Sequence, residues 1–284
     1  MSLKVVIVGG GLGGLAAALF LRRAGVQVTV VEQMAELREV GAGIVVAPNM
    51  VRPLVQLGLA DAMARFAPRL EAAWEFRRWQ DGRVLSSQPM GEACQQLYGA
   101  HCHVAHRGEM LALLREALPD DTVQLDRRCS GLHQDEHGAT LMLSSRDGST
   151  HELHADVVIG ADGIHSAVRP FVVPADEARF SGLCAFRCLV PAAAAPAMAL
   201  RPVQTLWLGP ERHFVHYPIS AGTLVNLVAI VPAGDWRNES WTAEGAIADL
   251  RAEFTGWDPR LHQLIDAATE TKRWALFDRS PLAR

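Results

Sequence analysis

The hydrophobic pattern of the first thirty residues predicts a strand, a helix and a second strand. Val5–Val8 is an apolar run of the length expected for a buried strand, and the helix-like stretch Leu15–Arg23 follows it and ends at Gly25, a predicted C-cap. A second apolar strand, Val26–Val31, comes next. Glycines cluster at the centre of the run 4–23, where a helix former would be expected, and no A-x-A-like cleavage site directly follows the run, which disfavours an export signal or a membrane span. The pattern therefore indicates a βαβ unit.

Downstream, the pattern changes to shorter elements separated by turns. Residues 40–59 predict a loop leading into a helix that ends near Gly58, and Asp81-Gly82 predicts the turn of a hairpin. Residues 123–162 predict an antiparallel meander. The other expected elements are an amphipathic helix within 106–118, strands at 185–190, 205–209, 213–219 and 224–231, and a helix over 240–257 capped by Ser240 or Thr242.

Composition and charge narrow the class of protein. The 284 residues suffice for one large domain or two modest ones, and 49% hydrophobic with 20% charged residues is ordinary for a globular protein. A formal charge of −4 offers no basic footprint for nucleic acid, and no later segment is apolar for long enough to span a membrane. Five cysteines without a CxxC pair favour a reducing compartment, so we expect a cytoplasmic protein.

The glycines after the first predicted strand carry the first candidate chemistry. Gly9, Gly11 and Gly14 fit G-x-G-x-x-G between a strand and a helix. In that fingerprint the first glycine allows a tight turn, the second lets the backbone approach a pyrophosphate, and the third lets helix and strand pack closely. Glu32 ends the second strand 18 residues beyond Gly14, close to the spacing of an acid that binds ribose hydroxyls. The combination predicts a dinucleotide site; the alternative, a plain Gly-rich turn, leaves Glu32 unexplained.

A second motif follows the apolar strand at 157–159. Asp162 lies on a glycine-flanked turn, Gly163 permits close backbone approach, and Ser166 begins a helix-like stretch. On the residues alone, Asp162 is equally well explained as a cofactor contact or as part of an Asx-type turn capped at Ser166.

Together, these segments resemble the single-component FAD-dependent aromatic hydroxylases of the salicylate, 3-hydroxybenzoate and 6-hydroxynicotinate type. The resemblance covers essentially the whole chain. It is carried by "VIVGGGLGGLAAALFLRRAGVQVTVVEQ" and "DVVIGADGIHSAVR", and, in order, by "GAGIVVAPN", "HRGEML", "FSGLCAFRCLV" and "HFVHYPISAGTLVNLVA".

The resemblance implies a role for each matching position. Gly9, Gly11, Gly14 and Glu32 would hold the ADP half of FAD, Arg107 would contact the ribityl–phosphate region, and Asp162 with Gly163 would complete the cofactor face.

His213 and Tyr217 would reach a small aromatic substrate, with NADH or NADPH as reductant and O₂ as the source of the transferred oxygen. Four residues apart on a strand, His213 and Tyr217 share one face, whereas His213 and His216 would lie on opposite faces. His213 would orient or deprotonate a phenol, and Tyr217 would hydrogen-bond a carboxylate or hydroxyl. The alternative for the pair is two polar-edged residues in a half-buried strand.

The cluster "HCHVAH" resembles metal-ligand spacing. No further ligand cluster accompanies His101, His103 and His106, and the adjacent residue, Arg107, belongs to the family's motif. We therefore expect no metal site.

The expected fold is an α/β Rossmann-like FAD-binding domain with an antiparallel meander, interleaved with a β-rich substrate domain. We expect residues 1–71 and 101–179 in the first, 72–100 and 180–276 in the second, and 277–284 returning to the first. In relatives a third motif of the type G-D-A-A-H-P follows, and residues 1–284 contain none, so the expected fold is the C-terminally truncated form of the family's. The leading hypothesis is a monooxygenase that hydroxylates a phenolic or carboxylated ring, with a homodimer allowed. The alternatives are a catalytically impaired nucleotide-binding relative and a flavin oxidoreductase without oxygen transfer.

Overall fold

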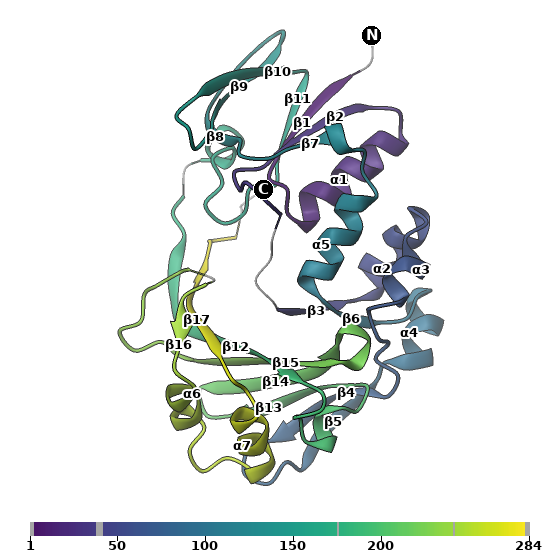
Figure 1. Cartoon of the computed structure of the whole chain (residues 1–284), viewed down its shortest axis with the longest axis vertical. Helices are drawn as coiled ribbons and strands as arrows, with labels where there is room; N and C mark the ends of the chain where they lie inside the picture. The colour runs from purple at the N-terminus through teal and green to yellow at the C-terminus, as the bar shows by residue number, and fades with distance from the viewer. Residues whose placement is uncertain (1–2, 38–41, 175, 241, 282–284) are drawn as a thin grey trace. The chain divides into compact units, whose positions relative to one another are not determined.

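The computed structural model describes residues 3–37, 42–174, 176–240 and 242–281, and divides into two compact units (Figure 1). The first unit comprises residues 1–38, 110–179 and 278–284, and the second comprises 39–109 and 180–277. Of the segments named above, residues 1–2, 38–41, 175, 241 and 282–284 lie outside the described part.

The first unit is built on a parallel sheet with the order β11-β1-β2-β7. Its strands are β1 (Lys4–Val8), β2 (Gln27–Val31), β7 (Val123–Gln124) and β11 (Val157–Gly160), and the meander consists of β8 (Arg128–Asp135), β9 (Gly138–Ser144) and β10 (Thr150–Ala155). Its helices are α1 (Leu12–Arg23), α5 (Arg107–Glu116, which begins in the second unit), and the 3-10 turns η1 (Asp120–Thr122) and η2 (Arg169–Phe171).

The alternation of β1 explains the two packed faces of this sheet. Val6 and Val8 join a buried cluster with Leu141 and Leu143 of the meander. Val5 and Ile7, which are also buried, point to the opposite face. A strand covered on both faces must be apolar throughout, and this accounts for the continuous Val-Ile run. The predicted Rossmann-like βαβ unit with its meander is confirmed.

The second unit is built on an eight-stranded sheet with the order β16-β17-β12-β15-β14-β13-β4-β5. Its strands are β4 (Ala73–Arg78), β5 (Val84–Pro89), β12 (Arg179–Pro191), β13 (Val203–Gly209), β14 (Arg212–Ile219), β15 (Leu224–Pro232), β16 (Glu244–Gly245) and β17 (Thr271–Asp278), with a separate pair β3 (Gly43–Val46) and β6 (His103–His106). Its helices are α2 (Pro48–Gln56), α3 (Ala60–Ala64), α4 (Gly91–Tyr98), α6 (Ile247–Glu253) and α7 (Pro259–Asp266), with the 3-10 turns η3 (Ala197–Ala199) and η4 (Ser220–Gly222).

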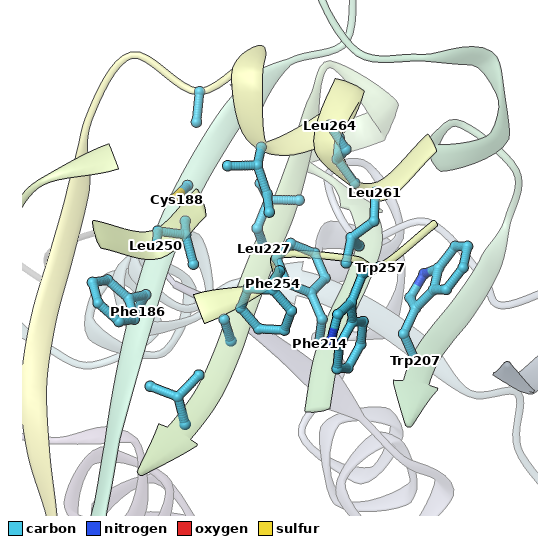
Figure 2. Close-up of a cluster of buried hydrophobic side chains, with 14 of the residues drawn as sticks. Phe186, Cys188, Trp207, Phe214, Leu227, Leu250, Phe254, Trp257, Leu261 and Leu264 are labelled. Atoms are coloured by element: carbon cyan, nitrogen blue, oxygen red, sulfur yellow. The ribbon is translucent and has the colours of Figure 1, made fainter. Parts of the chain in front are cut away.

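Two different layers cover the two faces of this sheet. Figure 2 shows the cluster on the α6–α7 side, where the Phe254 ring lies 5.3 Å from Phe214 of β14 and 4.7 Å from Trp257, both edge-on. On the other face Tyr217 and Ile219 of β14 pack in a cluster with Val104 of β6. The aromatic core therefore lies on the α6–α7 side of the sheet, and the β3–β6 pair lies on the opposite side (Figure 1).

Several local predictions are confirmed and others are corrected. The Asp81-Gly82 hairpin joins β4 and β5, and α2 is followed by Gly58 with a positive φ of 75°. The helix expected over 240–257 is confirmed only over Ile247–Glu253 (α6), because Glu244 and Gly245 pair with β17 as a short strand. The cap expected at Ser240 or Thr242 is therefore wrong.

Two further corrections concern predicted helices in the first unit. α1 begins at Leu12 rather than Leu15, so the second half of the glycine motif is the first turn of the helix. The helix-like stretch expected after Asp162 forms only the 3-10 turn η2.

The contact-defined units also divide the chain differently from the expected domains. Residues 39–71 and 101–109, expected in the FAD-binding part, make their contacts within the second unit. The reason is that β3 pairs with β6 and bonds to a side chain of β15. A flavin-binding role for these two segments stays a prediction.

Candidate functional site

The glycine turn between β1 and α1 is closely packed where two of its glycines lie. A Cβ on Gly14 would lie 1.9 Å from the Gly9 carbonyl oxygen, and a Cβ on Gly9 would lie 2.3 Å from the carbonyl oxygen of Ala161, after β11. Gly9 also has a φ of 109°. Both positions therefore require glycine, Gly14 for helix–strand packing and Gly9 for the approach of the two turns.

Gly11 lies in a different environment, at the N-terminus of α1. A Cβ on Gly11 would meet no described atom within 4 Å. Within the described chain, no side chain caps this end of α1 and its first turn has no acidic residue. The first-turn N–H groups of a helix point outward and attract anions, so this open cradle fits a pyrophosphate.

Glu32 is fixed at the end of β2 by backbone donors. The Gly10 N–H donates to its Oε2 at 2.7 Å and the Met34 N–H donates to its Oε1 at 2.9 Å. The carboxylate is thus held beside the glycine turn, as a ribose-binding acid requires. Gly10, which sequence reasoning passed over, ties the two parts of the fingerprint together.

Asp162 accepts hydrogen bonds within its own turn. Its Oδ1 accepts from the Ser166 hydroxyl at 2.5 Å, and its Oδ2 accepts from the N–H groups of Ala167 and Val168 at 2.7 and 3.2 Å. Gly163 has a φ of 80° and open space where a Cβ would lie. The turn therefore offers its backbone as an exposed surface, and direct cofactor contact by the Asp162 side chain stays a prediction.

The second unit carries His213 and Tyr217 on one face of β14. The strand pairs without interruption with β15 from His213 to Ile219, and with β13 as far as His216, so the two side chains project to the same side. His216 projects to the other side, is 1% exposed, and has neither ring nitrogen hydrogen-bonded among the described residues. The structure thus places the two candidates together and His216 apart from them.

Burial sets the protonation of these side chains. It lowers the pKa of the half-buried His213 below its usual value, so the imidazole is neutral at neutral pH and able to accept a proton. Burial raises the pKa of Tyr217, opposed by the positive charge of Arg187, so the phenol stays protonated. Burial and the charge of Arg77 lower the pKa of His216 to about 3.

Arg187 is a cationic residue on the same face, and sequence reasoning gave it no role. It lies opposite Val228 of β15, which lies opposite Val215, between His213 and Tyr217 on β14. Two strand spacings separate β12 from β14, about 10 Å. The Arg187 guanidinium carbon lies 4.1 Å from the ring centroid of Trp274, a cation–π distance.

The third candidate of the second unit, Arg107, begins α5. The Arg107 N–H donates to the Ala42 carbonyl at 2.8 Å. Gly43, which follows Ala42 in the chain, donates its N–H to Asn226 Oδ1 at 2.7 Å. Asn226 lies opposite Tyr217. Sequence reasoning missed Asn226, although a polar residue within the apolar strand "LVNLVAIV" was the available signal.

The histidines of "HCHVAH" make internal contacts. His103 is buried, and its Nδ1 lies 2.8 Å from the Ala67 carbonyl oxygen. Among the described residues no group of three or more His, Cys, Asp or Glu side chains is placed to hold a metal ion. The five cysteines are free and buried, and no helix of the described chain is long and apolar enough to cross a membrane.

Comparison with known proteins agrees with this geometry. A family model described as an FAD binding domain matches residues 2–261. The chain is 41% identical over 276 residues to 3-amino-4-hydroxybenzoate 2-monooxygenase PtmB3 of Streptomyces platensis, covering 97% of this chain and 68% of the relative. It is 34% identical over 283 residues to 6-hydroxynicotinate 3-monooxygenase of Pseudomonas fluorescens, covering 98% of this chain and 72% of the relative.

A solved structure extends the match to three dimensions. Klebsiella pneumoniae HpxO, complexed with FAD and uric acid, superposes with a TM-score of 0.84 at 28% identity, covering 99% of this chain and 70% of HpxO. The glycine cradle, the oriented Glu32 and the match over residues 2–261 lead to one conclusion: the chain belongs to the FAD-binding-domain family of flavin-dependent aromatic monooxygenases.

Proposed function

We propose that this chain is an FAD-dependent monooxygenase that hydroxylates a phenolic or carboxylated aromatic ring, using NADH or NADPH and O₂. The observation that carries the proposal is the pair on β14, where the neutral imidazole of His213 and the protonated phenol of Tyr217 share one face. An electron-rich ring needs both a proton acceptor for its hydroxyl and a hydrogen-bonding partner that fixes its orientation.

The residues of this chain would divide the work between cofactor and substrate. Bound FAD supplies the redox and oxygen chemistry. The N–H groups at the start of α1 would hold its pyrophosphate, and Glu32 its ribose hydroxyls. On the ring side, a nitrogen of His213 would accept the phenol proton while the Tyr217 hydroxyl holds a ring substituent. Ionising the phenol raises the electron density of the ring at the positions ortho and para to its oxygen.

Arg187 supports a carboxylated substrate. Its guanidinium stacks on Trp274 and lies on the face that carries His213 and Tyr217, about two strand spacings away. A benzoate with its hydroxyl toward β14 would direct its carboxylate toward β12, where a guanidinium can bind it in a bidentate manner. Among the relatives, the 3-amino-4-hydroxybenzoate enzyme fits this arrangement, so we propose an amino- or hydroxybenzoate as the substrate class.

The test is product formation by the purified chain with FAD. The rings to compare are 3-amino-4-hydroxybenzoate, 3-hydroxybenzoate and 6-hydroxynicotinate, with NADH and NADPH each as reductant. We expect a benzoate to stimulate NAD(P)H oxidation and to appear as a hydroxylated product by mass spectrometry. NAD(P)H oxidation without hydroxylated product from any ring would instead indicate a flavin oxidoreductase.

A variant pair tests the residue that carries the proposal. His213→Asn keeps a polar side chain but removes the proton acceptor, and we expect kcat to fall about 100-fold or more. His137→Asn, an exposed histidine between β8 and β9, is the matched control and should behave as wild type. Equal kcat values for both variants would remove His213 from the reaction.

Compartment and assembly are the remaining proposals. The cytoplasm is supported by five cysteines that are free and buried, as a reducing environment allows. Assembly as a homodimer can be tested by sedimentation analysis, in which a homodimer would show twice the mass of the 30.8 kDa chain.

A further inference from the structure

The side chain of Asn226 links two parts of the second unit that are distant in sequence. We propose that Asn226 is a positioning residue, which holds the Ala42–Gly43 peptide in place and so couples the ring-binding residue Tyr217 to Arg107. The inference rests on the proposed function, because it assigns a purpose to a contact between the proposed ring face and the proposed flavin contact.

The first step is the environment of Asn226 itself. It is 0% exposed and lies in the apolar strand β15, where an amide is costly to bury unless it is hydrogen-bonded. Its Oδ1 accepts the Gly43 N–H at 2.7 Å, across 183 residues of sequence. Its Nδ2 is buried and has no hydrogen-bond partner among the described residues. An apolar residue would fill β15 without this cost, so stability alone does not explain the amide.

The second step is the contact between Gly43 and Tyr217. A Cβ on Gly43 would lie 2.6 Å from Asn226 Cγ and 2.7 Å from Tyr217 Cε2. The backbone of β3 therefore lies directly on the edge of the tyrosine ring, which is 4% exposed. The hydrogen bond from Gly43 to Asn226 fixes the distance between the β3 backbone and β15. This distance determines how much space is left for the Tyr217 ring.

The third step leads to Arg107. The Ala42 carbonyl accepts the Arg107 N–H at 2.8 Å, at the first residue of α5. The Ala42–Gly43 peptide is thus held on one side by the start of α5 and on the other by Asn226. A shift of this peptide would move Arg107 and uncover Tyr217 together.

The test compares two neighbouring substitutions on β15. Asn226→Leu keeps the approximate size of the side chain but leaves the Gly43 N–H without its acceptor. Leu227→Ala is the control, because Leu227 is 1% exposed and belongs to the core on the α6–α7 face. It lowers overall stability without touching Gly43.

The first readout is amide hydrogen exchange of the FAD-free protein, measured on a peptide that contains Gly43. Loss of one buried hydrogen bond changes an opening equilibrium about tenfold. We expect exchange at Gly43 to be about tenfold faster in Asn226→Leu than in wild type. In Leu227→Ala, the ratio of the exchange rate at Gly43 to the rates in the neighbouring strands should be the same as in wild type. Equal protection of Gly43 in wild type and Asn226→Leu would refute the proposal that Asn226 holds the Ala42–Gly43 peptide in place.

The second readout is kinetic. In Asn226→Leu we expect KM for the aromatic ring to rise about tenfold and a smaller share of the NAD(P)H consumed to yield hydroxylated product; Leu227→Ala should keep the wild-type KM and yield. A wild-type chain that forms no hydroxylated product would refute the proposed function, while the exchange experiment would still decide the anchor. A wild-type KM and yield in Asn226→Leu, with an active wild-type enzyme, would refute the coupling alone.

Discussion

A single methyl group at Gly14 tests the packing of the glycine turn. Real Cβ atoms essentially never come within 3.0 Å of another heavy atom, and an alanine Cβ here would lie 1.9 Å from the Gly9 carbonyl oxygen. The helix and the turn must therefore separate by about 1.1 Å, the difference between these distances. The obstacle is backbone, which cannot rotate aside as a side chain can, so overpacking should cost about 1–3 kcal/mol.

Gly13 provides the matched control for this substitution. It is the preceding residue of α1, is exposed, and a Cβ there would meet no described atom within 4 Å. Both Gly→Ala changes gain the same helix propensity, up to about 1 kcal/mol. The difference between Gly13→Ala and Gly14→Ala thus isolates the overlap, and we expect Gly14→Ala to be less stable by about 1–3 kcal/mol.

Urea unfolding and FAD titration measure the two consequences. Gly14→Ala should bind FAD at least about tenfold more weakly, because the α1 N–H groups move away from the position set by Gly9. Gly13→Ala should bind as wild type. Equal stability and equal FAD affinity for the two variants would show that the turn tolerates a Cβ at Gly14, and the packing argument would be wrong.

Two further predictions concern buried polar groups of the second unit. His216 stays neutral in the folded protein down to about pH 3, whereas in the unfolded chain it binds a proton near pH 6.5, so stability is lost as pH falls from 6.5 toward 3. Between pH 7 and pH 5 the free energy of unfolding of wild type should fall by about 2 kcal/mol more than that of His216→Leu, which lacks this group. Parallel pH profiles of urea unfolding for the two proteins would contradict this. Asp258 caps α7 by accepting the Arg260 N–H at 2.9 Å, so Asp258→Ala should lower the free energy of unfolding by about 1–2 kcal/mol, as measured by urea unfolding; an unchanged midpoint would show that the cap contributes nothing.

Features that depend on local pattern could be predicted from the sequence. The glycine turn before α1, the hairpin at Asp81-Gly82 and the shared face of His213 and Tyr217 each follow from residues within a few positions of one another. Periodicity and turn chemistry act over this range, so the sequence carries enough information to place these elements.

Features that depend on distant partners could not be predicted. The sequence pattern predicts a helix at Glu244 and Gly245, but they are not helical because they pair with Lys272 and Thr271 of β17, which follows α6 and α7 in the chain. Asn226 contacts Gly43 across 183 residues, and β13 pairs in parallel with β4 across 130 residues (Val203 with Ala73). Single-sequence periodicity contains no signal for which strand will be the neighbour, so the sheet order and the Asn226 contact required the structure.

The central claim, oxygen transfer to an aromatic ring, is tested most directly by isotope labelling. The purified chain, loaded with FAD and given NADH and 3-amino-4-hydroxybenzoate under heavy-oxygen O₂, should form a product that is heavier by one labelled oxygen atom. The same reaction in heavy-oxygen water under ordinary O₂ should give unlabelled product. Oxidation of NADH with all of the labelled oxygen recovered as hydrogen peroxide, and none in the ring, would contradict the account.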